Sequence, residues 1–211
     1  MRVGRLHVLT DFLFQQRYPH AELARLAIAG GADTIQFRQK EGTTRDRLAG
    51  LRPTAAVCRA AGVPLLVDDD LALALAVDAD GVHLGQTDLP VADARAILAP
   101  RERPPLVGAT ATTVEDALLA EAAGADYVGF GPVFPTGSKR NPASVKGLAA
   151  LAAVCRGVRI PVVAIAGITP ERVAACLDAG AHGVAVMTAV TTAPDPQAAT
   201  ARFREVIERW G

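Results

Sequence analysis

Residues 124–147 read GADYVGFGPVFPTGSKRNPASVKG, and this stretch carries the pattern that decides the fold. It contains Gly-Ala-Asp, then a short apolar strand at Tyr127–Phe130, then a loop rich in glycine, proline and hydroxyl side chains. Glycine readily takes the left-handed backbone conformation that ends a helix. The same order of Gly-Ala-x and strand recurs from Gly31 and from Gly180. This recurrence predicts a chain built from repeated helix–strand units.

Short runs rich in Val, Ile and Leu alternate with Ala-, Leu- and Arg-rich segments of helical period along the whole chain. This alternation is typical of βα units around a parallel sheet. We predict eight strands, at Leu6–Leu9, Thr34–Phe37, Pro64–Val67, Gly81–Leu84, Leu106–Ala109, Tyr127–Phe130, Val162–Ile165 and Gly183–Val186. We predict helices at His20–Ala29, Thr44–Ala61, Leu71–Val77, Val91–Leu98, Val114–Ala123, Val145–Cys155, Pro170–Ala179 and Pro196–Trp210.

Eight βα units in 211 residues, without a linker or a shift in composition, predict one (β/α)8 TIM barrel domain that spans residues 1–211. A doubly wound sheet is the alternative architecture. Such a sheet usually carries a glycine-rich fingerprint directly after its first strand. The corresponding segment here, LTDFLF, lacks that fingerprint, so we favour the barrel.

The charge of the chain is balanced, with 22 basic and 22 acidic residues and a formal net charge of zero. We therefore expect no general attraction to nucleic acid or to an anionic membrane. No run approaches the ~20 consecutive apolar residues that span a bilayer, and the first residues are too polar for a signal peptide, so we expect a cytoplasmic protein. The three cysteines lie far apart in Ala-rich segments, and we interpret them as buried small hydrophobic residues.

The chemistry of a TIM barrel lies at the carboxyl ends of its strands, so the polar residues after each predicted strand are the candidates for a site. Gln36, Arg38 and Lys40 share one face by the two-residue period of a strand. The remaining candidates, in chain order, are Asp68, Asp69, Asp70, Asp88, Thr110, Thr136, Ser138, Lys139, Ala166, Gly167, Met187 and Thr188.

These candidates predict two anion sites. Asp69 and Asp88 follow neighbouring strands and can converge beside Arg38 and Lys40, and Mg²⁺ takes one or two carboxylates together with water and phosphate oxygens. The loops after the seventh and eighth strands can hold a phosphate on backbone N–H groups. This arrangement favours departure of a diphosphate, with Mg²⁺ and the two cations stabilising the leaving group while a monophosphorylated second substrate lies opposite.

Each group also has a structural interpretation. Asp68–Asp70 could cap the helix that starts at Leu71, and the loop after Phe130 could be an ordinary surface turn. His83 lies at the end of the fourth strand, but no carboxylate partner is evident, so we interpret it as structural. No nucleophile accompanied by a base is evident either.

Seven motifs occur in the order QFRQK, LLVDDDLALAL, DGVHLGQTDLP, VGATATT, ADYVGFGPVFPTGSK, AIAGIT and GVAVMTAV. Together they resemble the thiamine phosphate synthase family over Leu6 to Pro196. The resemblance implies an enzyme that joins an aminopyrimidine diphosphate to a thiazole phosphate and releases pyrophosphate. In the family the bond to the diphosphate breaks first, and the thiazole nitrogen captures a pyrimidine-stabilised carbocation. Such a reaction requires no general base.

The resemblance also implies a role for each matching residue. Gln36, Phe37, Arg38, Gln39, Lys40 and Asp68 would hold the pyrimidine diphosphate, and Asp69 and Asp88 would bind Mg²⁺. Thr110 and Lys139 would contact the diphosphate or the pyrimidine. Thr136, Gly137, Ser138, Gly167, Met187 and Thr188 would hold the thiazole phosphate. Arg38, Lys40, Thr110 and Lys139 are the residues expected to act in catalysis.

Some positions depart from the family pattern. Asp68-Asp69-Asp70 stands where Asn-Asp-Arg is usual, Thr110 where Ser is usual, Ser138 where Thr is usual, and Ala166-Gly167 where Gly-Gly is usual. A carboxylate at position 68 could repel an anionic substrate by about 1 kcal/mol near the surface.

Two alternatives remain open. A related thiazole tautomerase has a histidine at the position of Pro132 and lacks the metal carboxylates, so Pro132, Asp69 and Asp88 favour the synthase. A non-catalytic relative that binds a thiamine precursor is the other alternative, and Asp68 and Asp70 support it. A homo-oligomer is compatible with the sequence. We also expect residues 135–143 to close over the site as a lid.

Overall fold

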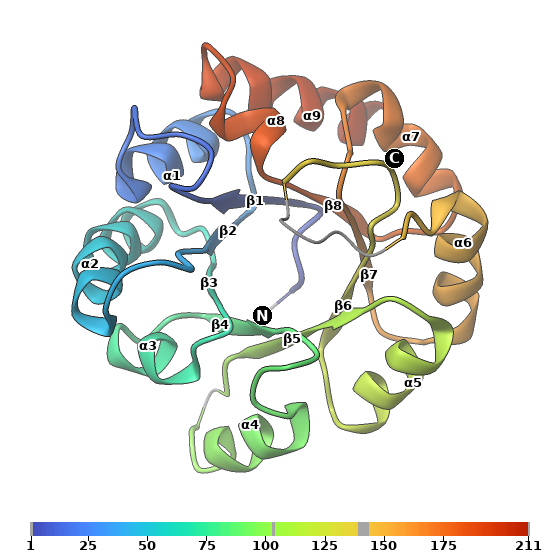
Figure 1. The fold of residues 1–211 in the computed structure, drawn as a ribbon, viewed down its shortest axis with the longest axis horizontal. Helices are drawn as coiled ribbons and strands as arrows, with labels where there is room; N and C mark the ends of the chain where they lie inside the picture. The colour runs from blue at the N-terminus through green and yellow to red at the C-terminus, as the bar shows by residue number, and fades with distance from the viewer. Residues whose placement is uncertain (1, 103, 139–143, 211) are drawn as a thin grey trace.

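Eight parallel strands pair in chain order and close into a barrel in the computed structural model, which describes residues 2–102, 104–138 and 144–210 (Figure 1). The strands are β1 (Leu6–Thr10), β2 (Thr34–Phe37), β3 (Leu65–Asp68), β4 (Gly81–Leu84), β5 (Leu106–Ala111), β6 (Tyr127–Phe130), β7 (Val162–Ile165) and β8 (Gly183–Val186). The helices surround them: α1 (His20–Ala29), α2 (Thr44–Ala61), α3 (Leu71–Ala76), α4 (Val91–Leu98), α5 (Val114–Ala122), α6 (Gly147–Gly157), α7 (Pro170–Asp178), α8 (Thr188–Thr191) and α9 (Pro196–Trp210).

The predicted (β/α)8 barrel is confirmed, and every predicted strand and helix is present with ends that shift by two residues or fewer. The largest helix shift is at α6, which starts at Gly147 instead of Val145. The N–H of Lys146 donates to the carbonyl of Pro132 at 2.8 Å, so the segment before Gly147 is tied to the loop after β6. Helix α8 was not predicted, because its four residues are too few to show a helical period.

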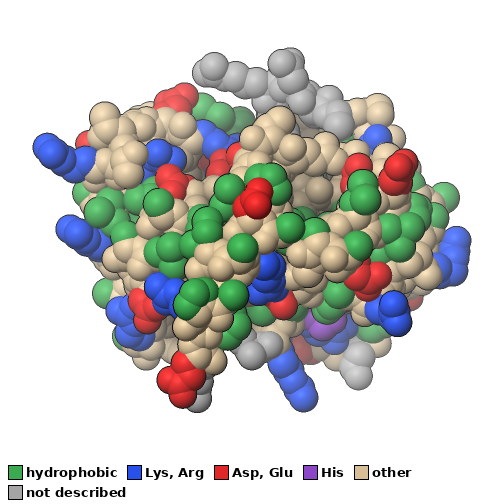
Figure 2. All heavy atoms as spheres, turned by 90° about the horizontal axis from the view of Figure 1, so that it is seen from below, with side chains coloured by type: hydrophobic (Ala, Val, Ile, Leu, Met, Phe, Trp, Pro, Cys, Tyr) green, Lys and Arg blue, Asp and Glu red, His purple; other side chains and the backbone are tan. Residues whose placement is uncertain are grey.

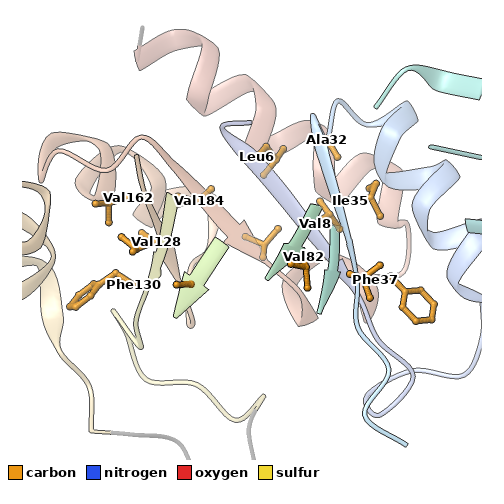
Figure 3. Close-up of a cluster of buried hydrophobic side chains, with 14 of the residues drawn as sticks. Leu6, Val8, Ala32, Ile35, Phe37, Val82, Val128, Phe130, Val162 and Val184 are labelled. Carbon is orange, nitrogen blue, oxygen red and sulfur yellow. The ribbon is translucent and has the colours of Figure 1, made fainter. Parts of the chain in front are cut away.

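The strands present an aliphatic face outward, toward the helices. Val82, Val107, Val128, Phe130 and their equivalents on the other strands are buried in one large cluster. Figure 3 shows part of this cluster, from Leu6 on β1 to Val184 on β8. Because successive strand residues point to opposite faces, this outer core leaves the alternate positions to fill the barrel lumen.

The lumen is filled by a different set of residues. A small cluster of Leu9, Leu66, Tyr127, Val163 and Ala185 packs inside the barrel. Other inward positions carry glycine or a polar side chain. They include Gly81, Gly108, Gly129, Gly183, His7, His83, Gln36 and Thr110.

An aspartate immediately before a strand caps the start of the preceding strand at three places around the barrel. Asp33 accepts the N–H of Leu6 at 2.9 Å, and Asp80 accepts the N–H of Leu65 at 2.9 Å. Asp126 accepts the N–H of Val107 at 2.7 Å. At Asp33 and Asp126 the Gly-Ala-Asp pattern therefore does more than end a helix, because its carboxylate accepts a backbone N–H of a neighbouring strand at the amino-terminal end of the barrel.

Acidic and basic side chains are interspersed over the face shown in Figure 2, in keeping with the balanced charge of the sequence. Within residues 2–102, 104–138 and 144–210, none of the helices combines the length and the apolar character needed to cross a bilayer.

Replacing Asp126 with Ala tests the capping. The variant leaves the N–H of Val107 without its acceptor and removes the ion-pair partner of Arg95, so we expect the free energy of unfolding to fall by about 1–3 kcal/mol in urea denaturation. Asp126→Asn is the matched control, because its amide oxygen still accepts while its charge is lost. An unchanged midpoint for Asp126→Ala would contradict the capping role.

Candidate active site

A cavity of about 580 Å³ opens at the carboxyl ends of the strands. It brings together most of the residues that the sequence indicated, although they come from seven different strand ends. These are Gln36, Arg38, Lys40, Asp68, Asp69, Asp88, Thr110, Thr136, Ser138, Gly167, Met187 and Thr188. The rule that polar residues after barrel strands face one common site therefore holds for this chain.

Four predicted residues do not line the cavity: Asp70, whose role is described below, and Phe37, Gln39 and Gly137. Phe37 follows the inward-facing Gln36, so it points outward, and its ring packs 4.3 Å from the ring of His20. Gln39 turns away and donates to the carbonyl of Glu41 at 3.2 Å. Gly137 also lies outside the lining. Lys139 and the second half of the predicted lid, residues 139–143, fall outside the described residues.

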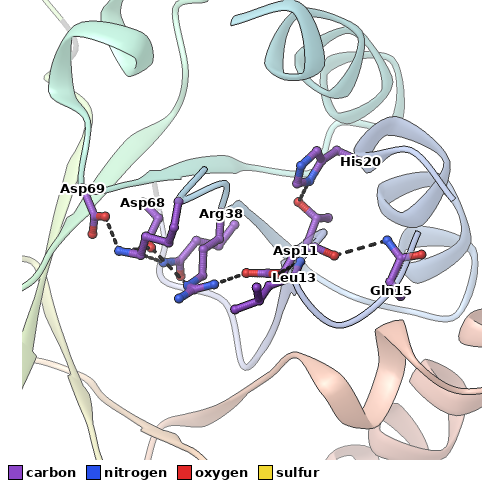
Figure 4. A network of polar contacts seen from close by, with 10 residues as sticks. Asp11, Leu13, Gln15, His20, Arg38, Asp68 and Asp69 are labelled. Carbon is purple, nitrogen blue, oxygen red and sulfur yellow. Dashed lines mark hydrogen bonds and ion pairs between the residues drawn. The ribbon is translucent and has the colours of Figure 1, made fainter. Parts of the chain in front are cut away.

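Arg38 is held between two carboxylates. Its guanidinium pairs with Asp11 on one side and with Asp68 on the other, where Nε lies 3.5 Å from Oδ2 (Figure 4). Its backbone N–H donates to the carbonyl of Thr10 at 3.1 Å. Asp11 was not among the predicted residues, although it lies two residues after the predicted first strand and obeys the rule applied to the other strands.

Lys40 is held in the same manner. Its ammonium contacts Asp69 and lies 3.1 Å from Oδ2 of Asp68. Burial lowers the pKa of Lys40, but the charges of the two carboxylates outweigh burial and raise that pKa overall. Lys40 therefore carries a full positive charge at neutral pH.

The three consecutive aspartates have different roles. Asp70 caps α3 by accepting the N–H of Leu73 at 3.0 Å, as the structural interpretation predicted. Asp68 instead faces the cavity and accepts from the amide of Gln36 at 2.8 Å, in addition to pairing with Arg38 and Lys40. The negative charge at position 68 is thus compensated by two cations and one amide donor.

Asp69 and Asp88 approach each other across the ends of β3 and β4. Burial raises the pKa of Asp88, the N–H of Gly85 opposes this at 2.7 Å, and the neighbouring Asp69 carboxylate raises it further. Among the described residues, no group of three or more His, Cys, Asp or Glu side chains is placed to share a metal ion. A cation at this pair would therefore need oxygens from water or substrate to complete its coordination.

The opposite wall offers backbone donors. Gly167 has a φ of 66°, and a side chain there would meet the carbonyl oxygen of Pro135 at 2.4 Å, so only glycine fits. Its neighbour Ala166 has a φ of 78°. Within the described part of the chain, the N–H groups of Gly167, Thr188 and Ala189 have no acceptor. They line the cavity beside the start of α8, an arrangement that suits a phosphate.

Thr136 and Ser138 complete that wall. Their hydroxyl oxygens lie 2.7 Å apart, and the N–H of Ser138 donates to the hydroxyl of Thr136 at 3.2 Å. Two further cavity residues, His83 and Tyr127, are joined to Thr110 through hydrogen bonds. Sequence reasoning did not connect them, because the contact depends on which residues of three strands lie side by side.

A (β/α)8 barrel whose mouth combines two carboxylate-bound cations with backbone N–H groups that have no acceptor among the described residues has the features of an enzyme that binds anionic substrates. The family model for thiamine monophosphate synthase matches residues 8–190. The chain belongs to this family.

The names of similar proteins agree with this family assignment. The chain is 60% identical to a thiamine-phosphate synthase of Salinibacter ruber, over 98% of this chain and 89% of that protein. It is 46% identical to one of Moorella thermoacetica, over 90% of each. The solved structure of a thiamine phosphate pyrophosphorylase from Pyrococcus furiosus superposes with a TM-score of 0.88 at 39% identity, covering 98% of this chain and 96% of that chain.

Removing Asp11 tests the support of Arg38. Asp11→Ala leaves one side of a nearly buried guanidinium unpaired, so we expect the free energy of unfolding to fall by about 3 kcal/mol in denaturant titration. Asp11→Asn should lose less, since its amide oxygen can still accept from the N–H of Leu13. A loss no larger than that of the exposed Asp93→Ala would contradict the proposed support.

Two buried histidines predict a pH dependence of stability. Burial lowers the pKa of His7 and of His20 to about 4, whereas the unfolded value is about 6.5. Between these values the unfolded chain binds more protons, so stability falls as the pH drops from about 6.5 to 4, by up to about 3 kcal/mol for each histidine. Urea unfolding at pH 7, 5.5 and 4.5 measures this. The slope should shrink in His20→Gln, and stability that rises toward pH 5 would contradict the prediction.

Proposed function

We propose that this chain forms thiamine phosphate, by transferring the methylene carbon of an aminopyrimidine from its diphosphate to the nitrogen of thiazole phosphate with release of pyrophosphate. The observation that carries the proposal is one cavity that contains both Arg38 and Lys40, held by carboxylates, and backbone donors that have no acceptor among the described residues. The names of the relatives support the same reaction.

Arg38 and Lys40 would bind the diphosphate. Both side chains are already oriented by Asp11, Asp68 and Asp69, so little reorganisation is needed when charge develops on the leaving group. The amide of Gln36 is fixed by Asp68 in the same wall, and it would help to orient the diphosphate substrate. Departure of pyrophosphate requires stabilised negative charge and no base, which fits this set of residues.

Asp69 and Asp88 fit a magnesium ion. Their oxygens are hard ligands, the two carboxylates lie next to each other, and the ammonium of Lys40 already contacts Asp69, which indicates that the position attracts a cation. Mg²⁺ held by these two residues would supply positive charge to the leaving diphosphate.

The second substrate would place its phosphate on the opposite wall. Gly167 and Thr188 would donate backbone N–H groups, and Thr136 and Ser138 would add hydroxyl donors. Met187, which packs against the lumen cluster, would border the thiazole ring. The role of Lys139 stays a prediction from the family resemblance.

Asp88→Ala tests the proposal. With both phosphorylated precursors and Mg²⁺, the unmodified protein should release pyrophosphate, and Asp88→Ala should release it at least about 100-fold more slowly, because a ligand of the charge-stabilising cation is lost. Asp93→Ala, an exposed acid on α4, is the matched control and should keep full turnover.

Two outcomes would contradict this function. Absence of pyrophosphate release under every condition would leave the tautomerase or the precursor-binding protein as the explanation. Full activity of Asp88→Ala would favour a tautomerase, which needs no metal carboxylates. Pro132, at the position where that relative carries histidine, supports the synthase.

A further inference from the structure

Three hydrogen-bonded side chains from adjacent strands form a chain along one side of the barrel lumen, at the floor of the cavity. The hydroxyl of Tyr127 on β6 lies 2.9 Å from Nδ1 of His83 on β4. Nε2 of the same imidazole lies 3.0 Å from Oγ1 of Thr110 on β5. All three residues line the cavity, and Thr110 is the member that the family resemblance assigns to the diphosphate or the pyrimidine.

Two glycines make room for this chain. His83 and Tyr127 are both register partners of Gly108, so the hydrogen bond between them passes over a residue without a side chain. A Cβ at Gly108 would lie 2.4 Å from the hydroxyl of Tyr127. Gly129, the partner of Thr110, would place a Cβ 3.0 Å from Cε1 of His83. Glycine at these two positions therefore leaves the space that the Tyr127 and His83 side chains occupy in the lumen.

The two hydrogen bonds that link Tyr127, His83 and Thr110 have one favoured direction. Tyr127 is 2% exposed, and Nδ1 of His83 is the one acceptor that its hydroxyl meets among the described residues. A buried phenol O–H without an acceptor is costly, so Tyr127 donates and Nδ1 accepts.

The protonation of His83 sets the next bond. A ring nitrogen that accepts carries no hydrogen, so the imidazole is in its neutral form with a single hydrogen. Because Nδ1 accepts, that hydrogen lies on Nε2, which donates to Oγ1 of Thr110. The hydrogen of the Thr110 hydroxyl is then left to point toward the cavity.

We propose that Tyr127 and His83 are positioning residues that make Thr110 a hydrogen-bond donor toward the cavity, and that the acceptor is an anionic oxygen of the diphosphate group. The assignment of this acceptor rests on the proposed function, whereas the direction of the two hydrogen bonds that link Tyr127, His83 and Thr110 does not. With the opposite direction, Thr110 would offer a lone pair and would select an amino group instead.

The hydrogen bond from Tyr127 also prevents His83 from acting as a base in the site. The one lone pair of a neutral His83 that could accept a proton is occupied by the hydroxyl of Tyr127. A histidine in the wall of a site that forms a carbocation would otherwise compete as a nucleophile or a base. Its side chain is instead used to orient a donor whose bond strengthens as negative charge develops on the leaving group.

The tautomer of His83 is the first test. In ¹⁵N-labelled protein at pH 7, the ring nitrogens of His83 should show the neutral form with its hydrogen on Nε2, with signals assigned by their change in Tyr127→Phe. A hydrogen on Nδ1, or a charged ring, would overturn the proposal whatever reaction the protein catalyses.

Binding of inorganic pyrophosphate with Mg²⁺, measured by calorimetry, is the second test. Tyr127→Phe should raise the Kd about 10-fold in the unmodified chain but less than about 2-fold in a Thr110→Val background. Thr110→Ser should keep the affinity, because the hydroxyl remains. Tyr18→Phe, at the other tyrosine and outside the cavity lining, is the matched control and should change nothing.

The outcomes separate the two proposals. Equal losses for Tyr127→Phe in both backgrounds would mean that the tyrosine acts on packing and not through Thr110, which overturns the positioning role. An unmodified protein that binds no pyrophosphate, together with the Nε2–H tautomer, would overturn the diphosphate acceptor and the proposed function while the direction of the chain stands.

Discussion

Closure of eight parallel strands imposes the constraint on which the rest of this molecule depends. The lumen of such a barrel admits only about four side chains in each layer, so inward positions cannot all be large. This chain satisfies the limit with glycines at the inward positions of β4, β5, β6 and β8, next to one tyrosine and two histidines. Most of the buried aliphatic side chains lie on the outer face of the barrel, so polar side chains can occupy part of the lumen.

Above this floor, the site is built from opposed charges. Arg38 and Lys40 each contact two carboxylates, and Asp68 is shared between them. Such sharing fixes long, flexible side chains in place before a ligand arrives, so the entropy of ordering them is lost during folding rather than during binding. An extra carboxylate, which alone would repel an anion, becomes part of the framework that orients the cations.

Much of the fold and part of the site could be predicted from the sequence. The strands were predictable because short runs rich in Val, Ile and Leu alternate with segments of helical period. The rule that polar residues after barrel strands face one site indicated Asp69, Asp88, Arg38 and Lys40, which line the cavity. The same rule could have found Asp11. Phe37 was assigned to the site only through the family motif, and such a motif also includes residues that face outward. The partnership of Tyr127 and His83 depends on register across three strands, which no local pattern encodes.

Ala166 has a backbone conformation that alanine itself does not favour. A residue with a side chain is held at a φ of 78°, where the resemblance to the family leads one to expect glycine. An L-residue pays about 1–2 kcal/mol in that region, yet alanine also has fewer unfolded conformations to lose than glycine, worth about 0.4–1 kcal/mol. The two effects partly cancel. The shape of the loop after β7 is therefore imposed by its surroundings, and a change between alanine and glycine at position 166 would have a small thermodynamic cost.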